Sequence, residues 1–523
     1  MANVQNYTER YRPQYHWTPA KNWMNDPNGL IYHKGQYHMY YQYNPTGDVW
    51  GNISWGHAVS PDLLHWEEQL IALNAFETPA SPLAELFFSG SAVFDEKDSS
   101  GFGKGRDAPL VAAYTSYYPN DTTLPNKQMV RGGTQALSIA YSTNDGLTWA
   151  EYEGNPVIPS PPAPYEDQWQ DFRDPFVFWH EKTCQWVMAV SLSKIRKLLI
   201  YTSTDLKKWE HVSEFGPANG VGGVWECPSL FPLPLNDDIS DLKWVLVLGI
   251  NPGGPAFTDA SATQYFVGTF DGRNFVADAD NLYAASSGKA NWLDYGPDYY
   301  AAATYNGLDN YERLAIAWMS DWAYAPLIPT SPWRSAMSVP RKLTLEKLNG
   351  QVRLISAPIQ SLKSLERAAA LYSKQWGVIS SETVAIPVSG KSLDISFAFC
   401  PGKSSTNVSL GVRTSGEGNG TLIGYDFATQ QMYVDRNSAT DNSSFSPKYK
   451  GKYFAPLKAA NGAIKLRILL DCSSVEVFGG HGESTITAQI FPSDQNTGIS
   501  VLSDGDVTDV EIQIHEIQSV WSK

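Results

Sequence analysis

The apolar segments of this chain are short, and turn-forming residues interrupt nearly all of them. Most contain aromatic or β-branched side chains and end at Gly, Pro, Asn or Asp, which is typical of β-strands. Residues 30–33, for example, lead into a turn at 34–35, and a second apolar run follows at 36–43. Because such segments can bury their apolar faces only between sheets, we predict an all-β fold.

Two weak internal repeats run through the first two thirds of the chain. In the first repeat, a strand is followed by Ser or Thr, then by an acid, and then by an aromatic residue, and the acid or the Ser caps a tight turn. The acid–aromatic pairs are Asp62 with Trp66, Asp145 with Trp149, Asp205 with Trp209, and Asp271 with Phe275. In the second repeat, short strands open near Asp26, Phe88, Asp174, Glu226 and Asp298. Recurrence at this scale favours five radial blades, a five-bladed β-propeller, over an ordinary meander of hairpins.

The pattern changes after residue 345. Residues 358–371 place Ile359, Leu362, Leu365 and Ala368 three positions apart, which we interpret as a short amphipathic helix in a connector. Strands alternate again from about residue 375, and 464–468 and 510–514 have strict period two. We therefore predict a propeller over 1–347, a connector over 348–374, and a β-sandwich over 375–523.

Three acids stand near the openings of predicted inner strands. Asp26 lies in Trp-Met-Asn-Asp-Pro-Asn-Gly, Asp174 in Phe-Arg-Asp-Pro-Phe, and Glu226 in Trp-Glu-Cys-Pro. Each motif taken alone is also ordinary turn or ion-pair chemistry. In a radial fold, however, the starts of the innermost strands converge at one end of the central channel, so the three acids are expected to share a pocket.

Two carboxylates are what glycoside hydrolysis requires, and abundant aromatic rings fit a sugar substrate. One carboxylate attacks the anomeric carbon or activates water, and the other protonates the leaving oxygen. A third acid can stabilise positive charge on the sugar ring. The chain also has 18 Trp and 28 Tyr residues, whose rings can stack on the apolar faces of sugars.

These motifs resemble those of glycoside hydrolase family 32, which contains invertases, exo-inulinases, levanases and related fructosyltransferases. The resemblance covers nearly the whole chain and includes Gln-Tyr-Asn-Pro at 42–45, Trp-Gly-Asn-Ile-Ser-Trp-Gly-His at 50–57, Phe-Ser-Gly-Ser-Ala-Val at 88–93, Trp-Met-Ser-Asp-Trp at 318–322 and Ser-Val-Glu-Val-Phe-Gly-Gly at 474–480. It implies the same propeller and sandwich that the repeats predict.

The resemblance also implies residue roles. Asp26 would be the nucleophile that forms a covalent fructosyl-enzyme, Glu226 the general acid and base, and Asp174 the transition-state stabiliser. Six positions match the family's fructose pocket: Asn25, Gln42, Trp50, Ser89, Arg173 and Trp318. We expect Arg173 to help keep Asp174 ionised.

The implied activity is that of a retaining β-fructofuranosidase. It would release terminal fructose from sucrose and inulin-type fructans; the alternative is a fructosyltransferase that makes kestose-type oligosaccharides. A non-catalytic sugar-binding propeller would require one of the three acids to be replaced, and none is. For the second domain, a module that supports the propeller is favoured over an independent lectin.

Composition restricts partners and cofactors. The net charge of −15 argues against a nucleic-acid or anionic-membrane surface, and the chain lacks 18 consecutive apolar residues. The four cysteines show no metal-ligand spacing, so we expect neither a metal nor another cofactor. Exposed strand edges make a homodimer plausible.

Localisation stays open at this stage. The sequence shows no apolar leader segment, which fits an intracellular enzyme or a mature secreted one. Six sequons, at Asn6, Asn52, Asn120, Asn407, Asn419 and Asn442, hint at secretion.

Overall fold

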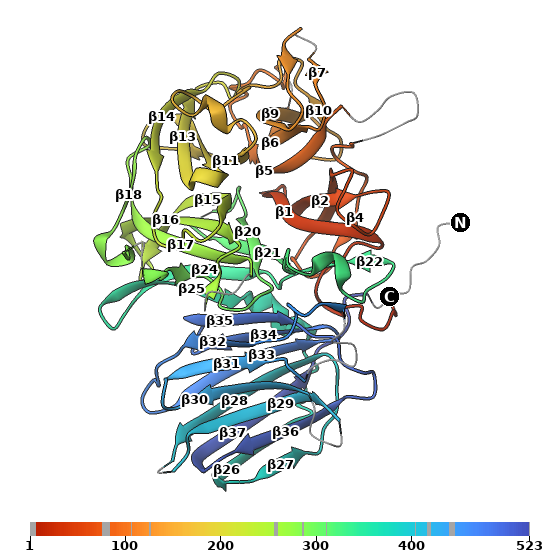
Figure 1. Ribbon diagram of the computed structural model, residues 1–523, viewed down its shortest axis with the longest axis vertical. Helices are drawn as coiled ribbons and strands as arrows, with labels where there is room; N and C mark the ends of the chain where they lie inside the picture. The colour runs from red at the N-terminus through yellow and green to blue at the C-terminus, as the bar shows by residue number, and fades with distance from the viewer. Residues whose placement is uncertain are drawn as a thin grey trace.

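The computed structural model describes residues 7–75, 84–105, 107–124, 127–255, 260–284, 287–309, 311–402, 404–415, 420–438 and 445–521. Strands account for 52% of the structure and helices for 4%, which confirms the all-β prediction. The molecule has two parts stacked along its long axis, with residues up to Pro358 in the upper part of Figure 1 and the later strands below.

Three sheets form the first half of the upper part, and all their pairings are antiparallel except that of β22 with β1. The first has the order β22-β1-β2-β3-β4, the second β10-β9-β6-β5, and the third β11-β12-β13-β14. Their strands are β1 (Asn22–His33), β2 (Gln36–Asn44), β3 (Ser54–Ser60), β4 (Glu67–Glu68), β5 (Leu86–Phe94), β6 (Leu110–Tyr118), β9 (Thr134–Ser142), β10 (Ala150–Glu151), β11 (Phe172–His180), β12 (Gln185–Leu192), β13 (Lys197–Ser203), β14 (Glu210–Phe215) and β22 (Trp333–Arg334).

A ten-stranded sheet completes the upper part. Its main path is β18-β17-β16-β15-β24-β21-β20, and β19, β23 and β25 pair at its sides. The strands are β15 (Val224–Leu235), β16 (Asp238–Asn251), β17 (Ala262–Phe270), β18 (Phe275–Ala277), β19 (Asn291–Trp292), β20 (Tyr300–Thr304), β21 (Leu314–Met319), β23 (Ala336–Met337), β24 (Arg341–Leu348) and β25 (Gln351–Pro358). A small hairpin, β7 (Thr122–Thr123) with β8 (Met129–Val130), lies apart from these sheets.

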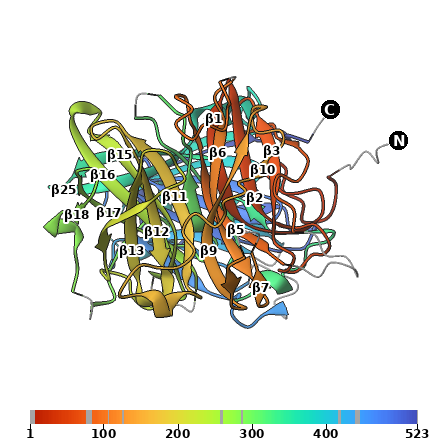
Figure 2. The same cartoon turned by 90° about the horizontal axis from the view of Figure 1, so that it is seen from above.

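Five strands line the centre of the upper part and contact one another in a closed ring. β1 contacts β5 and β20, β11 contacts β5 and β15, and β15 contacts β20. β22 pairs in parallel with β1, so a late segment of the chain is joined to the first strand. In the view from above, the strands of successive sheets run in roughly the same direction (Figure 2). The ring therefore brings corresponding ends of strands that are distant in sequence to one place.

The first sequence repeat forms the turn between the third and fourth strands of a sheet. Asp62 accepts hydrogen bonds from the backbone N–H groups of residues 64 and 65, and Asp205 and Asp271 make equivalent contacts. In the second copy the serine is the cap, one of the two residue types expected: Ser142 Oγ accepts the N–H of Gly146 at 2.9 Å, and Asn144 Oδ1 accepts the N–H of Thr148 at 3.0 Å. Asp145 pairs instead with His33 and Lys34, which the sequence repeat did not indicate.

The lower part consists of two six-stranded sheets. One has the order β26-β37-β28-β33-β34-β35 and the other β27-β36-β29-β30-β31-β32. The strands are β26 (Tyr372–Ser380), β27 (Thr383–Ile386), β28 (Leu393–Pro401), β29 (Asn407–Thr414), β30 (Thr421–Asp426), β31 (Gln431–Asp435), β32 (Lys452–Pro456), β33 (Ile464–Asp471), β34 (Ser474–Gly479), β35 (Ser484–Gln489), β36 (Gly498–Ser503) and β37 (Asp506–Glu516). A single apolar cluster takes side chains from both sheets. The period-two strands are confirmed, because Ile464, Leu466 and Ile468 are buried along β33.

The segment between the two parts contains the short helix expected there. Residues 360–365 form it as a 3₁₀-helix, η7 (Gln360–Leu365). Ile359, Leu362 and Leu365 are buried, whereas Ala368 is exposed beyond the helix end. The physical reason lies in the spacing, because apolar residues every three positions match the 3.0 residues per turn of a 3₁₀-helix.

The expected domain boundary at residue 347 falls inside β24, and β25 pairs with β24 as far as Pro358. Four other short 3₁₀-helices are described: η1 (Glu166–Gln168), η2 (Ser193–Ile195), η4 (Ala279–Asn281) and η6 (Ala325–Leu327).

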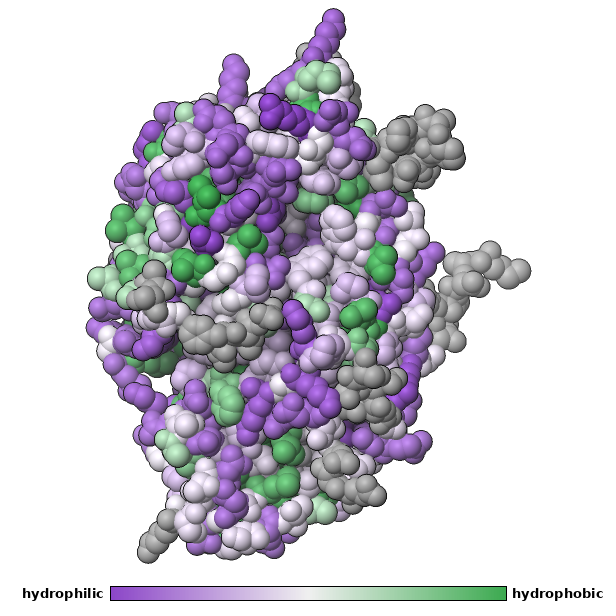
Figure 3. Space-filling view, in the orientation of Figure 1, coloured by the Kyte–Doolittle hydropathy of each residue, from purple (hydrophilic) through white to green (hydrophobic). Residues whose placement is uncertain are grey.

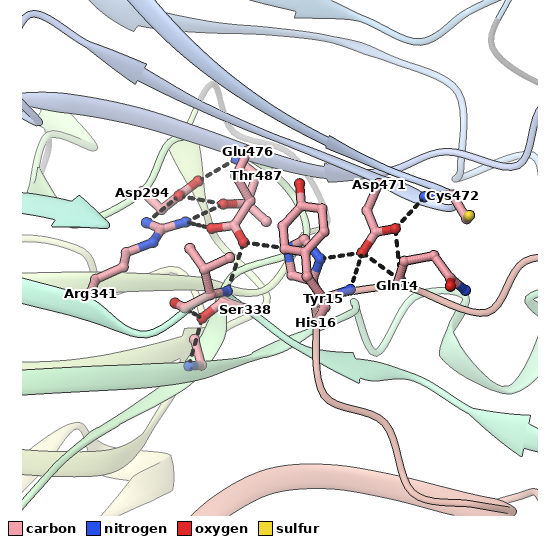
Figure 4. A network of polar contacts seen from close by, with 12 residues as sticks. Gln14, Tyr15, His16, Asp294, Ser338, Arg341, Asp471, Cys472, Glu476 and Thr487 are labelled. Carbon is pink, nitrogen blue, oxygen red and sulfur yellow. Dashed lines mark hydrogen bonds and ion pairs between the residues drawn. The ribbon is translucent and has the colours of Figure 1, made fainter. Parts of the chain in front are cut away.

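A buried ionic network joins the N-terminal segment, the ring of sheets and the lower part (Figure 4). His16 lies between Asp471 and Glu476, with Nδ1–Oδ2 and Nε2–Oε1 distances of 2.8 and 2.9 Å. Arg341 of β24 contacts Glu476 and also Asp294, the latter at 2.9 Å. All five side chains are fully buried. Replacing one of these side chains by a neutral residue would leave the charge of its partner buried and uncompensated, which is strongly unfavourable.

The surface seen in Figure 3 mixes hydrophilic and hydrophobic residues. Among the described residues, none of the helices combines the length and the apolar character needed to cross a bilayer. Of the six sequons, Asn52, Asn120 and Asn407 are described, and Asn6, Asn419 and Asn442 lie outside the described residues.

Candidate active site

Each of the five inner strands is irregular near its first residues. Pairing with the neighbouring strand shifts register between residues 24 and 27, 88 and 90, 173 and 176, 226 and 229, and 300 and 303. In three strands a proline follows the irregular residue directly: Pro27, Pro175 and Pro228. Proline lacks a donor for the ladder and is tolerated at such bulges. The bulges turn selected side chains toward the ring centre instead of into the sheets.

Asp26 lies in the bulge of β1, and 8% of its surface is exposed. Its carboxylate accepts hydrogen bonds from Ser89 Oγ at 2.7 Å and Asn25 Nδ2 at 3.1 Å, and Cys227 Sγ donates at 3.3 Å. Trp23 Nε1 donates to Asn25 Oδ1 at 2.8 Å and fixes that amide. Burial raises the pKa of Asp26, the hydrogen bond from Ser89 opposes the rise, and the Glu226 carboxylate adds to it.

Asp174 occupies a left-handed backbone conformation at the start of β11, with φ of +64°. Its N–H donates to Thr115 Oγ1 at 2.8 Å, and its Oδ2 accepts the N–H of Cys227 at 2.9 Å. Burial raises the pKa of Asp174 to about 7; Arg173 lowers it, and the Glu226 and Asp26 carboxylates raise it further. Arg173 therefore favours the ionised form of Asp174, as expected, but desolvation and the two neighbouring carboxylates outweigh its effect on the pKa.

Glu226 is the most accessible of the three acids, with 18% of its side chain exposed. Arg173 Nε donates to its Oε1 at 3.0 Å, and the Tyr300 hydroxyl donates to its Oε2. Arg173 is itself held by Gln135 Oε1 at 3.1 Å. The guanidinium beside Asp174 in the sequence thus makes its hydrogen bond to Glu226, which comes from the next inner strand.

The other predicted pocket residues occupy different positions around this cluster. Gln42 is buried and donates to the Phe87 carbonyl at 2.9 Å, behind Ser89. Trp50 is 42% exposed and meets Phe88 edge to face, with ring centroids 6.0 Å apart. Trp318 is fully buried behind Trp23, at a centroid distance of 6.0 Å. The structure therefore brings Asn25, Ser89 and Arg173 into direct contact with the acids, and Trp318 only indirectly.

Sequence reasoning missed four contacts of this site: Thr115, Gln135, Cys227 and Tyr300. Cys227 was visible only as the middle of a short Glu-Cys-Pro match. The available signal was the proline that follows Asp26, Asp174 and Cys227, since it marks the bulges.

Below the acids, a cavity of about 20 Å³ lies between the inner strands and has room for about one water molecule.

Comparison with known proteins agrees with this geometry. The profile of the "Glycosyl hydrolases family 32 N-terminal domain" matches residues 16–358, and that of the "Glycosyl hydrolases family 32 C terminal" matches residues 361–516. An extracellular exo-inulinase from Aspergillus ficuum is 50% identical over 100% of this chain and 97% of its own length. A levanase from Bacillus subtilis is 42% identical over 99% of this chain and 72% of its own. The crystal structure of an exo-inulinase from Aspergillus awamori superposes with a TM-score of 0.95 at 48% identity, covering 99% of this chain and 100% of that one.

A ring of sheets with acids gathered at one end is the arrangement of a carbohydrate-cleaving enzyme. The chain is a glycoside hydrolase and belongs to family 32.

Proposed function

We propose that this enzyme is a retaining β-fructofuranosidase that releases terminal fructose from sucrose and inulin-type fructans. The observation that carries the proposal is the meeting of Asp26, Asp174 and Glu226, from three different inner strands, around Cys227 and Arg173. Two carboxylates acting on one glycosidic bond are what this reaction needs. The exo-inulinase and levanase relatives, similar over nearly the whole chain, support a fructan as the substrate.

Asp26 is the proposed nucleophile. Its carboxylate attacks the ketose anomeric carbon, and the bond to the glycosidic oxygen breaks as Glu226 gives that oxygen a proton. Three donors, from Ser89, Asn25 and Cys227, favour the charged form of Asp26 before the attack. Ionised Glu226 then takes a proton from water, which attacks the same carbon and frees Asp26 and fructose.

The remaining site residues are proposed to bind the fructose unit. Asp174 accepts hydrogen bonds from its hydroxyls and stabilises positive charge on the ring. Asn25, Ser89, Arg173 and the exposed Trp50 are proposed to contact the fructose unit, and the buried Gln42 and Trp318 are proposed to support this pocket from behind Ser89 and Trp23. The protein requires no metal in this scheme.

The proposed architecture is a five-bladed propeller, a connector and a β-sandwich over 375–523, with the end of the propeller moved from residue 347 to Pro358, because β25 pairs with β24 as far as that residue. The closed ring of five inner strands supports five blades. The ten-stranded sheet counts as two of them, because the β15 and β24 halves are joined by a single parallel pairing, Leu235 with Leu345. A homodimer through exposed strand edges remains a prediction, which light scattering in solution would check.

The first experiment is a product analysis on sucrose, kestose, inulin and levan. Hydrolysis gives equimolar glucose and fructose from concentrated sucrose. Excess glucose together with kestose-type oligomers would instead establish the fructosyltransferase alternative, which shares the first half-reaction.

A second experiment tests the covalent step. Asp26→Ala and Glu226→Ala should each lower kcat by several orders of magnitude. Both variants should still fold, which circular dichroism checks. In buffer containing methanol, the parent enzyme should form the methyl β-fructofuranoside with retained configuration. Near-normal activity in either variant, or a product of inverted configuration, would rule out the double-displacement mechanism.

A further inference from the structure

A cavity of about 790 Å³ opens at the end of the ring opposite the acids. It is lined by the last residues of β5 and β11 and by the segment that follows β20, including Phe94, His180 and Leu308. Asp174 and His180 are six residues apart on β11, so the cavity lies about 20 Å from the acid cluster at ~3.3 Å per residue. The volume falls within the roughly 300–1,000 Å³ of ligand pockets.

The cavity is separated from the acid cluster by side chains inside the ring. Asn306 Nδ2 donates to the Ala92 and Val177 carbonyls at 2.9 and 3.1 Å, which joins three inner segments at that level. The water-sized cavity lies between this level and the acids. A ligand in the large cavity would therefore not reach the reacting atoms.

Four aromatic side chains in the lining are incompletely buried: Phe94, Trp179, Trp244 and Tyr311. Trp244 is held by Phe270 and Phe178, with centroid distances of 4.9 and 5.5 Å. Trp179 packs edge to face on Trp186 at 5.2 Å. Rings fixed in this way offer rigid apolar faces of the kind on which sugar rings stack.

The polar groups of the lining suit a neutral ligand. Arg313 donates from Nη1 to the Tyr305 carbonyl at 2.7 Å, whereas its buried Nε has no hydrogen-bond partner. Burial lowers the pKa of Arg313 to about 10, and no acid is close enough to oppose this. The other charged lining residues carry both signs: Asp95, Glu96, Lys97, Glu181, Lys182 and Asp309. Together with Arg313 the lining has four acids and three bases, so its net charge is 3 − 4 = −1, and this small charge matches a hydroxyl-rich molecule better than an ion.

We propose that this cavity is a second, non-catalytic carbohydrate site that binds an internal segment of a fructan chain. The identity of the sugar rests on the proposed function, while the presence of a sugar site rests on the aromatic and polar lining. Binding at two sites would raise the effective concentration of polymer ends near the acids without a new catalytic group. Sucrose is too short to occupy both sites at once.

The test uses Trp179→Ala and Tyr311→Ser in the cavity. The matched control is Trp376→Ala on β26, a half-buried Trp that also has a lysine over its ring, Lys374 at 4.9 Å, as Lys97 lies over Trp179 at 5.2 Å. We expect each cavity variant to raise KM for inulin at least five-fold and to leave kcat/KM for sucrose within two-fold. The control should change neither value.

A binding measurement separates this proposal from the proposed function. The Asp26→Ala protein, with saturating sucrose present, should still bind inulin in calorimetry, and adding Trp179→Ala should abolish that binding. Equal affinity with and without Trp179 would overturn the second site even if the enzyme cleaves fructans. Failure of the parent enzyme to cleave fructans, with Trp179-dependent binding intact, would overturn only the activity. Tyr311 is 42% exposed, so its variant keeps the test valid if Trp179→Ala fails to fold.

Discussion

Cys227 connects the acids of the active site at the scale of single residues. Its N–H donates to Asp174, and its thiol contacts Asp174 at 3.7 Å and Asp26 at 3.3 Å. A backbone φ of +50° allows both contacts. Burial, followed by the charges of Asp174 and Asp26, raises the pKa of this thiol far above its usual range. Cys227 therefore remains a neutral donor between two carboxylates.

Tyr300 is a positioning residue for Glu226, and its hydroxyl can be removed without changing its ring. Tyr300→Phe should lower kcat about 10- to 100-fold, because a hydrogen bond to a charged group contributes roughly 1.5–3 kcal/mol. Steady-state kinetics on sucrose measures the effect. The control is Tyr305→Phe, since the buried Tyr305 hydroxyl has no hydrogen-bond partner. Equal losses in the two variants would contradict a specific role for Tyr300.

The raised pKa of Asp174 predicts a pH-dependent stability. The folded protein keeps this proton up to about pH 7, whereas the unfolded chain releases it near pH 3.8. The folded state thus binds more protons between these values, so this group makes stability fall as pH rises from about 4 to 7. Asp174→Asn should therefore gain stability over the parent enzyme as pH rises through that window.

Denaturant unfolding at pH 4, 5.5 and 7 measures this difference. Asp145→Asn serves as the opposite case, because the pKa of Asp145 is lowered by its hydrogen bond to Lys34. Its loss should destabilise the protein more at the higher pH values, though weakly, since the side chain is half exposed. A constant difference for Asp174→Asn across the three pH values would rule out this linkage.

At the scale of elements, the irregular inner strands depend on residues without side-chain bulk. Gly29 in β1 has a φ of +53°, and a Cβ there would lie 2.8 Å from Tyr40 and 2.9 Å from Trp55. Gly29→Ala should lower the free energy of unfolding by about 2–4 kcal/mol through backbone strain and crowding. Gly35 shares the left-handed backbone at +81° but has open space around it. Gly35→Ala should cost only about 1 kcal/mol, and chemical denaturation compares the two.

The sequence predicts the strands better than it predicts the bulges within them. Alternation identifies β33 and β37, and the capped turns before Trp66 and Trp209 follow from residue type alone. The bulges arise from pairing with neighbouring strands, which one strand's sequence does not encode. For the same reason Tyr300 escaped prediction: it looks like an apolar strand residue until β20 lies beside β15. Asp298, which opens the fifth repeat, binds Arg436 of the lower part at 2.7 Å and does not join the acids.

At the scale of the whole molecule, deprotonation of His16 should lower the stability of the folded protein at alkaline pH. Burial lowers the pKa of His16, but hydrogen bonds to Asp471 and Glu476 outweigh this and raise it to about 9. The charged form therefore stabilises the folded state fully below about pH 6.5, and this contribution is lost as pH rises through 9. The melting temperature of the parent protein should fall over that range, and His16→Gln should flatten the fall. Replacing the exposed His481 by Gln should leave the fall in melting temperature unchanged. Identical curves for all three proteins would contradict the prediction.

Closure of the ring has a consequence for synthesis of the protein. β22, at residues 333–334, pairs with the edge of β1 opposite β2, and β20 also contacts β1. During synthesis, β1 therefore lacks its last neighbouring strands until some three hundred further residues have been translated. Until then the first and fourth inner strands, and with them Asp26 and Glu226, have no fixed distance. The complete active site would therefore form only late in translation, when the last strands join the ring. Until then, chaperones would have to shield the open edge of β1.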